Sequence, residues 1–448
     1  MAASIIDIKK LENNLQARME NIQVHPFCLS GKLTRSIGLT LEAKGIWAPL
    51  GTVCHINNNN TCLESVVTGF TDNRLFLMPI QNVDGLPPGA AITPTYKNFE
   101  VPVGFELLGR VIDSCGVPLD GKGALQCTEK RSLYGKSINP MHRRAIEKPL
   151  DVGVRAINAM LTVGQGQRLG LMAGSGVGKS VLLGMLSRNT VADIIVVGLI
   201  GERGREVKEF IDNNLGDAIN RAVVIAAPAD YSPLLRLYGA WCAMTVAEYF
   251  REKGKNVLLL MDSVTRFAQA QREIGLAMNE PPATKGFPPS AFTILPRLIE
   301  RAGNGSLGEG SITAIFTVLA EGDDQQDPIV DAARAVLDGH IVLSRKYADL
   351  GHYPAIDIEA SVSRVMSSVT TVQHRKNAIL FKKYYSLYLE NRDLVNMGAY
   401  VNGMNPDLDY ALKYINVMET FLQQDVDEKV NFEESVIALE NIIHPSEQ

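Results

Sequence analysis

Long hydrophobic runs are missing from this chain of 448 residues, and none approaches the roughly 18 apolar residues that a membrane-spanning helix needs. The first ten residues also lack the apolar core of a secretory signal. Cysteine is scarce: the six cysteines show no Cys-x-x-Cys spacing, which favours reduced thiols in a cytoplasmic protein. An excess of positive charge is absent too, since the net charge is −5 and the pI about 5.9. Because a nucleic-acid binder needs a basic face, we expect no nucleic acid among the main partners.

The length and composition describe a globular protein with more than one core. Hydrophobic residues make up 46% of the chain and charged residues 21%. A chain of this length exceeds what one hydrophobic core supports, so we expect two or three domains.

The first two predicted segments are an amphipathic helix over residues 1–22 and a β-barrel domain over residues 23–97. In the helix, apolar residues recur at spacings of three and four. This stripe either packs on its own chain or binds a partner or a second copy. From about residue 25 the hydrophobic period changes to two and turn clusters become frequent, as at residues 71–73. Short alternating strands with frequent turns predict a small β-barrel.

The rest of the chain is predicted to form an α/β domain and then a helical domain. Residues 98–150 are rich in glycine and proline and read as a connection, which we include in a domain over residues 98–367. From about residue 151, apolar strand candidates alternate with helical patterns, which is typical of a parallel α/β sheet. Residues 368–448 contain no pattern typical of strands, so we predict that they form a helical domain. The strand candidates are 168–172, 193–200, 222–227, 257–261 and 312–319, and the core candidates of the helical domain are Leu380, Tyr384, Leu387 and Leu389.

The most informative motif is AGSGVGKS at residues 173–180. Apolar runs before and after it predict a strand, a glycine-rich turn and a helix in that order. Backbone N–H groups of such a turn and the helix N-terminus attract phosphate. Lys179 would reach the β- and γ-phosphates, and Ser180 would hold Mg²⁺ through its hydroxyl. The strict pattern begins with glycine, whereas this one begins with alanine, and an ordinary glycine-rich turn is the alternative. The predicted nucleotide-binding residues are Ala173, Gly174, Ser175, Gly176, Val177, Gly178, Lys179, Ser180 and Val181.

Two acidic residues follow predicted strands. Asp262 ends the apolar run at 257–261, where an α/β sheet places ligand chemistry, and it is a candidate Mg²⁺ ligand. A helix N-cap is the alternative interpretation of Asp262. Glu202 follows the strand candidate at 193–200 and is the candidate for activating water, with Arg203 beside it in the predicted catalytic set. The alternative for this second segment is a solvated loop of mixed charge.

The segment GERGRE at residues 201–206 resembles the catalytic subunits of rotary-type ATPases. That resemblance implies that Glu202 is the catalytic base. Residues 262–268, 351–357 and 361–364 resemble further segments of the family. They imply that Tyr353 lies against the adenine and that Arg364 is an arginine finger acting in the neighbouring subunit's site. The alternatives are a core tyrosine for Tyr353 and a structural ion pair for Arg364.

Three further stretches, at 280–290, 321–328 and 337–343, resemble export ATPases of type III secretion systems, and the run EGDDQQDP at 321–328 most resembles the flagellum-specific ATPase. The resemblance implies a RecA-like P-loop ATPase core with an N-terminal β-barrel and a C-terminal helical domain. It also implies a homohexameric ring that hydrolyses ATP with Mg²⁺, powering or assisting the unloading and export of flagellar proteins through a membrane gate.

The implied partners are a stator-like regulator at the N-terminal helix, a central-stalk-like protein in the ring opening, membrane proteins of the export gate, and export substrates with their chaperones. The implied location is the cytoplasm, peripherally at the inner membrane of the flagellar base. Three alternatives remain open: an injectisome ATPase with the same chemistry, a proton-coupled synthase subunit, and an ATP-dependent docking scaffold with little turnover.

Overall fold

The computed structural model describes residues 29–58, 61–81, 85–135, 138–319 and 327–445. Its contacts divide the chain into two compact units, one up to Lys97 and the other from Asn98. The predicted helix over residues 1–22 and most of the stretch at 321–328 lie outside the described residues. The predicted domain boundaries stay predictions. No helix in the described part of the chain is long and apolar enough to cross a membrane.

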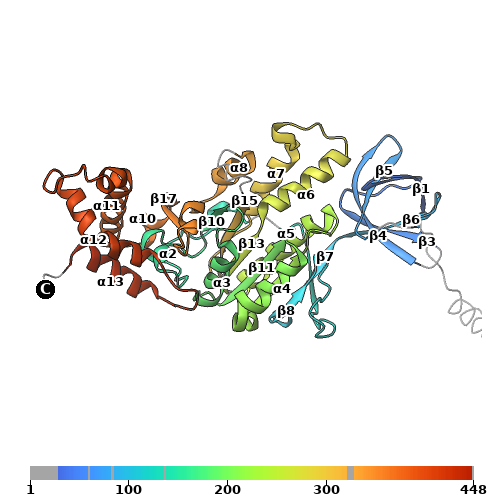
Figure 1. Ribbon diagram of the computed structural model, residues 1–448. Coiled ribbons are helices and arrows are strands. Elements are labelled where there is room, and N and C mark those ends of the chain that lie inside the picture. The colour runs from blue at the N-terminus through green and yellow to red at the C-terminus, as the bar shows by residue number, and fades with distance from the viewer. Residues whose placement is uncertain (1–28, 59–60, 82–84, 136–137, 320–326, 446–448) are drawn as a thin grey trace, which may run out of the picture. The chain divides into compact units, whose positions relative to one another are not determined.

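The first unit contains a closed β-barrel, drawn in blue in Figure 1. The barrel order is β1-β2-β5-β4-β3-β6. Leu41 and Leu77 are paired on neighbouring strands and fully buried, because alternate side chains of each strand point into the barrel. The barrel predicted from the period of two is confirmed. Its strands are β1 (Gly31–Ile37), β2 (Thr40–Lys44), β3 (Thr52–Asn58), β4 (Thr61–Thr71), β5 (Arg74–Pro79) and β6 (Ala91–Asn98).

The second unit is built on a nine-stranded sheet within the described residues. The order of neighbouring strands in the sheet is β17-β16-β10-β15-β13-β11-β12-β8, and β14 pairs with β15 in addition. Residues of β11 and β12 are buried throughout, as in parallel strands that are covered on both faces. These strands are β8 (Arg110–Ile112), β10 (Arg168–Ala173), β11 (Ile194–Ile200), β12 (Ala222–Ala227), β13 (Asn256–Asp262), β14 (Gly303–Asn304), β15 (Ser311–Leu319), β16 (Gly339–Leu343) and β17 (Ile356–Ser363), and a separate pair is formed by β7 (Glu100–Val103) and β9 (Glu129–Ser132).

The sheet differs in one respect from the parallel sheet predicted. All five strand candidates form strands, but β14 and β17 run antiparallel to their neighbours, so the sheet is mixed. Strand β17 follows β16 after a connection that holds only one short helix. A short connection suits antiparallel strands, whereas a parallel neighbour needs a longer crossover.

Helices alternate with the strands and then fill the C-terminal part of the chain (Figure 1). Phe381 and Tyr385 are the buried aromatic residues of α11, whereas the predicted core positions Leu380, Tyr384, Leu387 and Leu389 are only partly buried. For Leu380 and Tyr384 the prediction was therefore displaced by one position along the helix, and Leu387 and Leu389 are not core residues. The helices are α2 (Arg155–Met160), α3 (Lys179–Asn189), α4 (Gly204–Glu209), α5 (Pro233–Glu252), α6 (Val264–Ala277), α7 (Pro289–Ile299), α8 (Pro328–Val336), α9 (Arg345–Asp349), α10 (Met366–Val369), α11 (Val372–Asn396), α12 (Pro406–Leu422) and α13 (Phe432–Ile443).

The packing of Phe381 gives a first testable prediction. Its ring lies 5.3 Å from that of Phe421 on α12, centroid to centroid, so it joins two helices of the C-terminal part. We expect Phe381→Ala to lower the free energy of unfolding of these helices by about 3–5 kcal/mol, because it leaves a cavity. Urea unfolding, monitored by the far-UV circular dichroism signal of the helices, measures this change. Ile379→Ala is the matched control on the same helix, since Ile379 is 68% exposed. Equal losses in the two variants would show that Phe381 is not a core residue of these helices.

Candidate active site

Three predicted segments meet at one edge of the sheet. Strands β10, β13 and β11 all run parallel to their sheet neighbours, and they end at Ala173, Asp262 and Ile200. In the register of these pairs Leu199 lies opposite Asp262, so the segments that follow β11 and β13 start at the same level. This edge holds the carboxyl ends of the strands, where open α/β sheets bind ligands.

The loop between β10 and α3 has the backbone geometry of a phosphate site. Gly176 and Gly178 have φ values of 78° and 88°, which favour glycine. Gly178 caps α3, and no side chain of the described residues caps the first N–H groups of this helix. These free N–H groups and the helix dipole favour an anion at this end. The exposed Ser180 and the loop line a cavity of about 500 Å³.

Lys179 lines this cavity together with Glu202 and contacts both acidic candidates. Its Nζ lies 2.6 Å from Asp262 Oδ1 and 3.1 Å from Glu202 Oε1. Burial by itself lowers the pKa of Lys179, but the two carboxylates and their hydrogen bonds outweigh burial and hold the pKa above its usual value. Lys179 is therefore a cation at neutral pH, placed where phosphate would bind.

Asp262 is buried at the end of β13. The hydroxyl of Thr317 donates a hydrogen bond of 2.7 Å to its Oδ1. Burial raises the pKa of Asp262, and the charge of Lys179 opposes that shift. The N-cap of α6 is Ser263, whose hydroxyl accepts from Arg266 N, so the alternative interpretation of Asp262 as the cap is wrong.

The oxygens of Asp262 and Ser180 fit a magnesium ion that is bound chiefly through phosphate. Mg²⁺ prefers oxygen ligands and often takes only one or two carboxylates together with phosphates and water. The described part of the chain contains no group of three or more His, Cys, Asp or Glu side chains that could hold a metal ion.

The segment at 201–206 presents Glu202 to the cavity. Gly201 N donates to Ala227 O, and Ala229 N donates to Glu202 O, so the neighbouring strand end fixes the backbone on both sides. Arg203 also lines the cavity, but its side chain is 80% exposed and lies 3.6 Å from Glu206. Glu202 thus has a defined position, whereas Arg203 stands at the cavity mouth.

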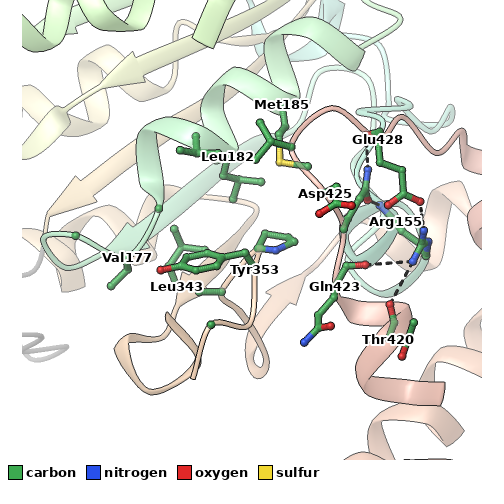
Figure 2. A pocket seen from close by; sticks show the side chains of 18 residues that line it. Arg155, Val177, Leu182, Met185, Leu343, Tyr353, Thr420, Gln423, Asp425 and Glu428 are labelled. Carbon is green, nitrogen blue, oxygen red and sulfur yellow. Dashed lines mark hydrogen bonds and ion pairs between the residues drawn. The ribbon is translucent and has the colours of Figure 1, made fainter. Parts of the chain in front are cut away.

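Tyr353 lines a second cavity of about 780 Å³, which Figure 2 shows beside the phosphate-binding loop. Its side chain is 45% exposed, so the alternative interpretation as a core tyrosine is wrong. A Cβ at Gly178 would lie 3.3 Å from Tyr353 Cε1, so the ring packs directly against the loop. Gly176, Gly178 and Val181 line both cavities, so the two lie next to each other along the loop.

Arg364 lies elsewhere. It follows β17, is exposed, and is absent from the described residues that line the two cavities. Its backbone N donates to Asp338 O, and within the described chain its guanidinium makes no ion pair. The structure therefore separates Arg364 from the site of its own chain and gives no support to a structural ion pair.

Two arginines that line the phosphate cavity, and a buried threonine that contacts Asp262, were not predicted from the sequence. Arg266 lines it with its Nε buried and unpaired within the described residues. Arg345 lines it as well, and its Nη2 donates to Ser175 O at 3.1 Å. The third is Thr317, which holds Asp262. The available signals were an isolated polar residue inside an apolar strand for Thr317 and positions just beyond β13 and β16 for the two arginines.

Two family models match the chain. The model of the ATP synthase alpha/beta family, nucleotide-binding domain, matches residues 153–363. That of the T3SS EscN ATPase C-terminal domain matches residues 370–441. Together they cover the site and the C-terminal helices.

Similar proteins span nearly the whole chain. The flagellum-specific ATP synthases of Pseudomonas aeruginosa and Salmonella typhimurium are 56% and 57% identical, covering 93% and 92% of this chain and 93% of each relative. A type 3 secretion system ATPase of Sinorhizobium fredii is 47% identical, over 91% of this chain and 90% of its own length. The structure of the assembled ATPase EscN from enteropathogenic E. coli matches with a TM-score of 0.88 and 42% identity, covering 92% of this chain and all of that one. The chain belongs to the family of flagellum-specific ATP synthases, whose nucleotide-binding domain is that of the ATP synthase alpha/beta family.

Proposed function

We propose that this ATPase hydrolyses ATP to ADP and phosphate at the carboxyl edge of its sheet, with Mg²⁺ as cofactor. The observation that carries the proposal is that Lys179 and Glu202 line one cavity beside the phosphate-binding loop and that Lys179 also contacts the buried Asp262. A cation, a buried carboxylate and a second carboxylate in reach of the same space are what phosphoryl transfer to water requires.

Each residue has a separate task in this proposal. Lys179 and the N–H groups at the start of α3 bind the β- and γ-phosphates. Glu202 orients the attacking water and accepts its proton. Ser180 and Asp262 hold Mg²⁺, which when bound neutralises charge on the phosphate oxygens. Tyr353 packs against the adenine, and Arg203 adds positive charge at the mouth of the cavity.

The working form in this proposal is a homohexameric ring with its sites at subunit interfaces. EscN has been solved as an assembled ATPase and in complex with its central stalk EscO. Arg364 is exposed and away from the cavities of its own chain, so it is free to reach a neighbour's site and stabilise the charge that develops there. We propose a stalk-like protein in the ring opening by analogy with that complex.

The cellular task we infer is the unloading and export of flagellar proteins, with ATP hydrolysis powering or assisting it. The flagellar relatives above are more similar to this chain than the type 3 secretion ATPase of Sinorhizobium fredii, at 56–57% against 47% identity. This difference favours the flagellar role over the injectisome role. The further partners we propose are a stator-like regulator at the N-terminal helix, the membrane proteins of the export gate, and export substrates with chaperones. The proposed location is the cytoplasmic side of the inner membrane at the flagellar base.

The specific activity of Mg-ATP hydrolysis as a function of protein concentration tests this proposal. We expect specific activity to rise steeply with concentration, because association completes each site with Arg364 of a neighbour. If specific activity does not change with concentration, size-exclusion chromatography at each concentration shows whether the protein is a fully assembled ring or an active monomer. Full activity in a proven monomer would contradict the shared site. Absence of Glu202-dependent activity at every concentration would favour the docking scaffold.

A further inference from the structure

A buried hydroxyl lies inside the sheet next to the candidate active site. It belongs to Thr317 on β15, which stands between Phe316 and Val318 and is fully buried. Strands that are covered on both faces are usually apolar, and a buried hydroxyl lowers stability unless it forms hydrogen bonds. The partners of this hydroxyl therefore show what it does at this position.

The hydroxyl of Thr317 donates to the carboxylate at the end of the next strand. Strand β15 lies between β10 and β13 and pairs with both in parallel. Thr317 Oγ1 lies 2.7 Å from Asp262 Oδ1 and 3.2 Å from Met261 O. A hydroxyl has one proton to donate, and its bond to an ionised carboxylate is the stronger of the two. The shorter distance agrees with this assignment, so the proton points to Asp262.

A second threonine fixes the two strand ends relative to each other. Thr265 lies in the first turn of α6, three residues after Asp262. Its Oγ1 accepts from Leu319 N at 2.8 Å and donates to Leu319 O at 3.4 Å. The segment after Asp262 is thus joined to the last residue of β15, so the separation of Thr317 and Asp262 is defined by the backbone on both sides.

Asp262 uses one carboxylate oxygen for contacts within the protein. Its Oδ1 accepts from Thr317 and from Lys179 Nζ, which lies 2.6 Å away. Its Oδ2 forms no hydrogen bond to any other residue that the structure describes. An ionised carboxylate can accept at both oxygens, and carboxylate oxygens are ligands that Mg²⁺ takes in proteins. Oδ2 is therefore the oxygen that remains for the metal.

The contact with Thr317 does not depend on whether phosphate is bound. In the proposed function Lys179 binds the β- and γ-phosphates, so a bound nucleotide competes with Asp262 for the Lys179 ammonium group. Thr317 is fully buried and is absent from the described residues that line the two cavities, so no phosphate competes for its hydroxyl. Its hydrogen bond can hold the Asp262 carboxylate in one orientation while Lys179 moves to the nucleotide.

We propose that Thr317 is a positioning residue for the metal, because its hydroxyl fixes the Asp262 carboxylate with Oδ2 left for Mg²⁺. This inference rests on the proposed function, since it requires a nucleotide that brings Mg²⁺ to the site. Groups that donate to a metal-binding carboxylate orient it, and loss of such a group typically lowers metal affinity or activity by about 10- to 100-fold.

Binding of mant-AMP-PNP, a fluorescent ATP analogue that is not hydrolysed, tests the proposal on the full chain without turnover. The measured quantity is the ratio of its affinity in excess Mg²⁺ to its affinity in EDTA. In Thr317→Val, which exchanges the hydroxyl for a methyl group, this ratio should fall about tenfold or to about one, whichever is reached first. The affinity in EDTA should stay at the wild-type value, because Lys179 and the phosphate-binding loop are unchanged. Thr317→Ser keeps the hydroxyl and should keep the wild-type ratio.

Thr313→Val is the matched control. Thr313 is buried on the same strand, and its hydroxyl accepts from Gly166 N at 2.9 Å, four residues before Thr317 and away from the carboxyl edge of the sheet. The control removes the same group from the same strand, so it reports what the loss of a buried hydrogen bond does by itself. It should bind the analogue with the wild-type ratio.

The outcomes separate this inference from the proposed function. An unchanged ratio in Thr317→Val overturns the inference alone, even if both affinities fall, because Thr317 would then only stabilise the fold. An equal fall of the ratio in Thr313→Val, or a fall in Thr317→Ser as large as in Thr317→Val, overturns it as well. Should Thr317→Val not fold, Thr317→Ala supplies the same comparison. Wild-type protein that binds the analogue equally with and without Mg²⁺, or not at all, contradicts the proposed function and the inference with it.

Discussion

Glu202→Gln is expected to lower the turnover number of Mg-ATP hydrolysis by about 10²- to 10⁴-fold, the usual contribution of a positioned general base. The amide keeps the size of the side chain but has little affinity for the proton of the attacking water. Binding of Mg-ATP should persist, because Lys179 keeps its partner Asp262 and its reach to the phosphates. Steady-state ATPase assays measure the turnover number, and binding of the fluorescent nucleotide mant-ATP with Mg²⁺ measures the affinity.

The matched control is Glu209→Gln, which removes an exposed carboxylate at the end of α4, outside the cavity lining. It should hydrolyse ATP at the wild-type rate. Turnover by Glu202→Gln within a factor of about three of wild type would mean that another group activates the water, since loss of a general base costs far more. Loss of nucleotide binding would instead assign Glu202 a structural role beside Lys179.

Arg364→Ala is expected to lower turnover by about 10³- to 10⁵-fold, as removal of an arginine finger does in related phosphoryl-transfer enzymes. The defect should be complemented between chains. In an equal mixture of Arg364→Ala and Glu202→Gln chains, about one interface in four would join an intact Glu202 to a neighbour's intact Arg364 if the ring contacts are head to tail. Some activity should therefore return on mixing two inactive proteins, and ATPase assays of the mixture measure it.

The exposed cation Lys376 on α11 offers a matched control for the loss of positive charge. The Lys376→Ala variant should hydrolyse ATP at the wild-type rate by itself, without a second chain to complement it. Mixed assembly must be verified, for example by copurification of two differently tagged chains. If verified mixed rings recover no activity, Arg364 does not act in the neighbour's site. Its separation from the cavities of its own chain would then need another explanation.

Much of the fold could be predicted from the sequence because the relevant patterns are local. The period of two predicted the barrel, and five apolar runs predicted five strands of the sheet. The antiparallel direction of β17 could not be predicted, because it depends on how the connection after β16 returns to the sheet and not on the strand's own residues. The buried positions of α11 were missed for a related reason: that helix packs on α12 and α13, so apolar or aromatic residues occupy several of its faces.

By itself the sequence determined the phosphate-binding loop and the position of Asp262 after a buried strand. Both depend on contiguous residues whose chemistry requires one local geometry: strand, glycine turn and helix for the loop, and a strand end for the carboxylate. Only the tertiary structure decided that Thr317 holds Asp262, that Arg345 reaches the loop, and that residues 423–426 line the second cavity. These contacts join residues far apart in the chain, and in sequence such polar side chains cannot be told from those of a solvated surface.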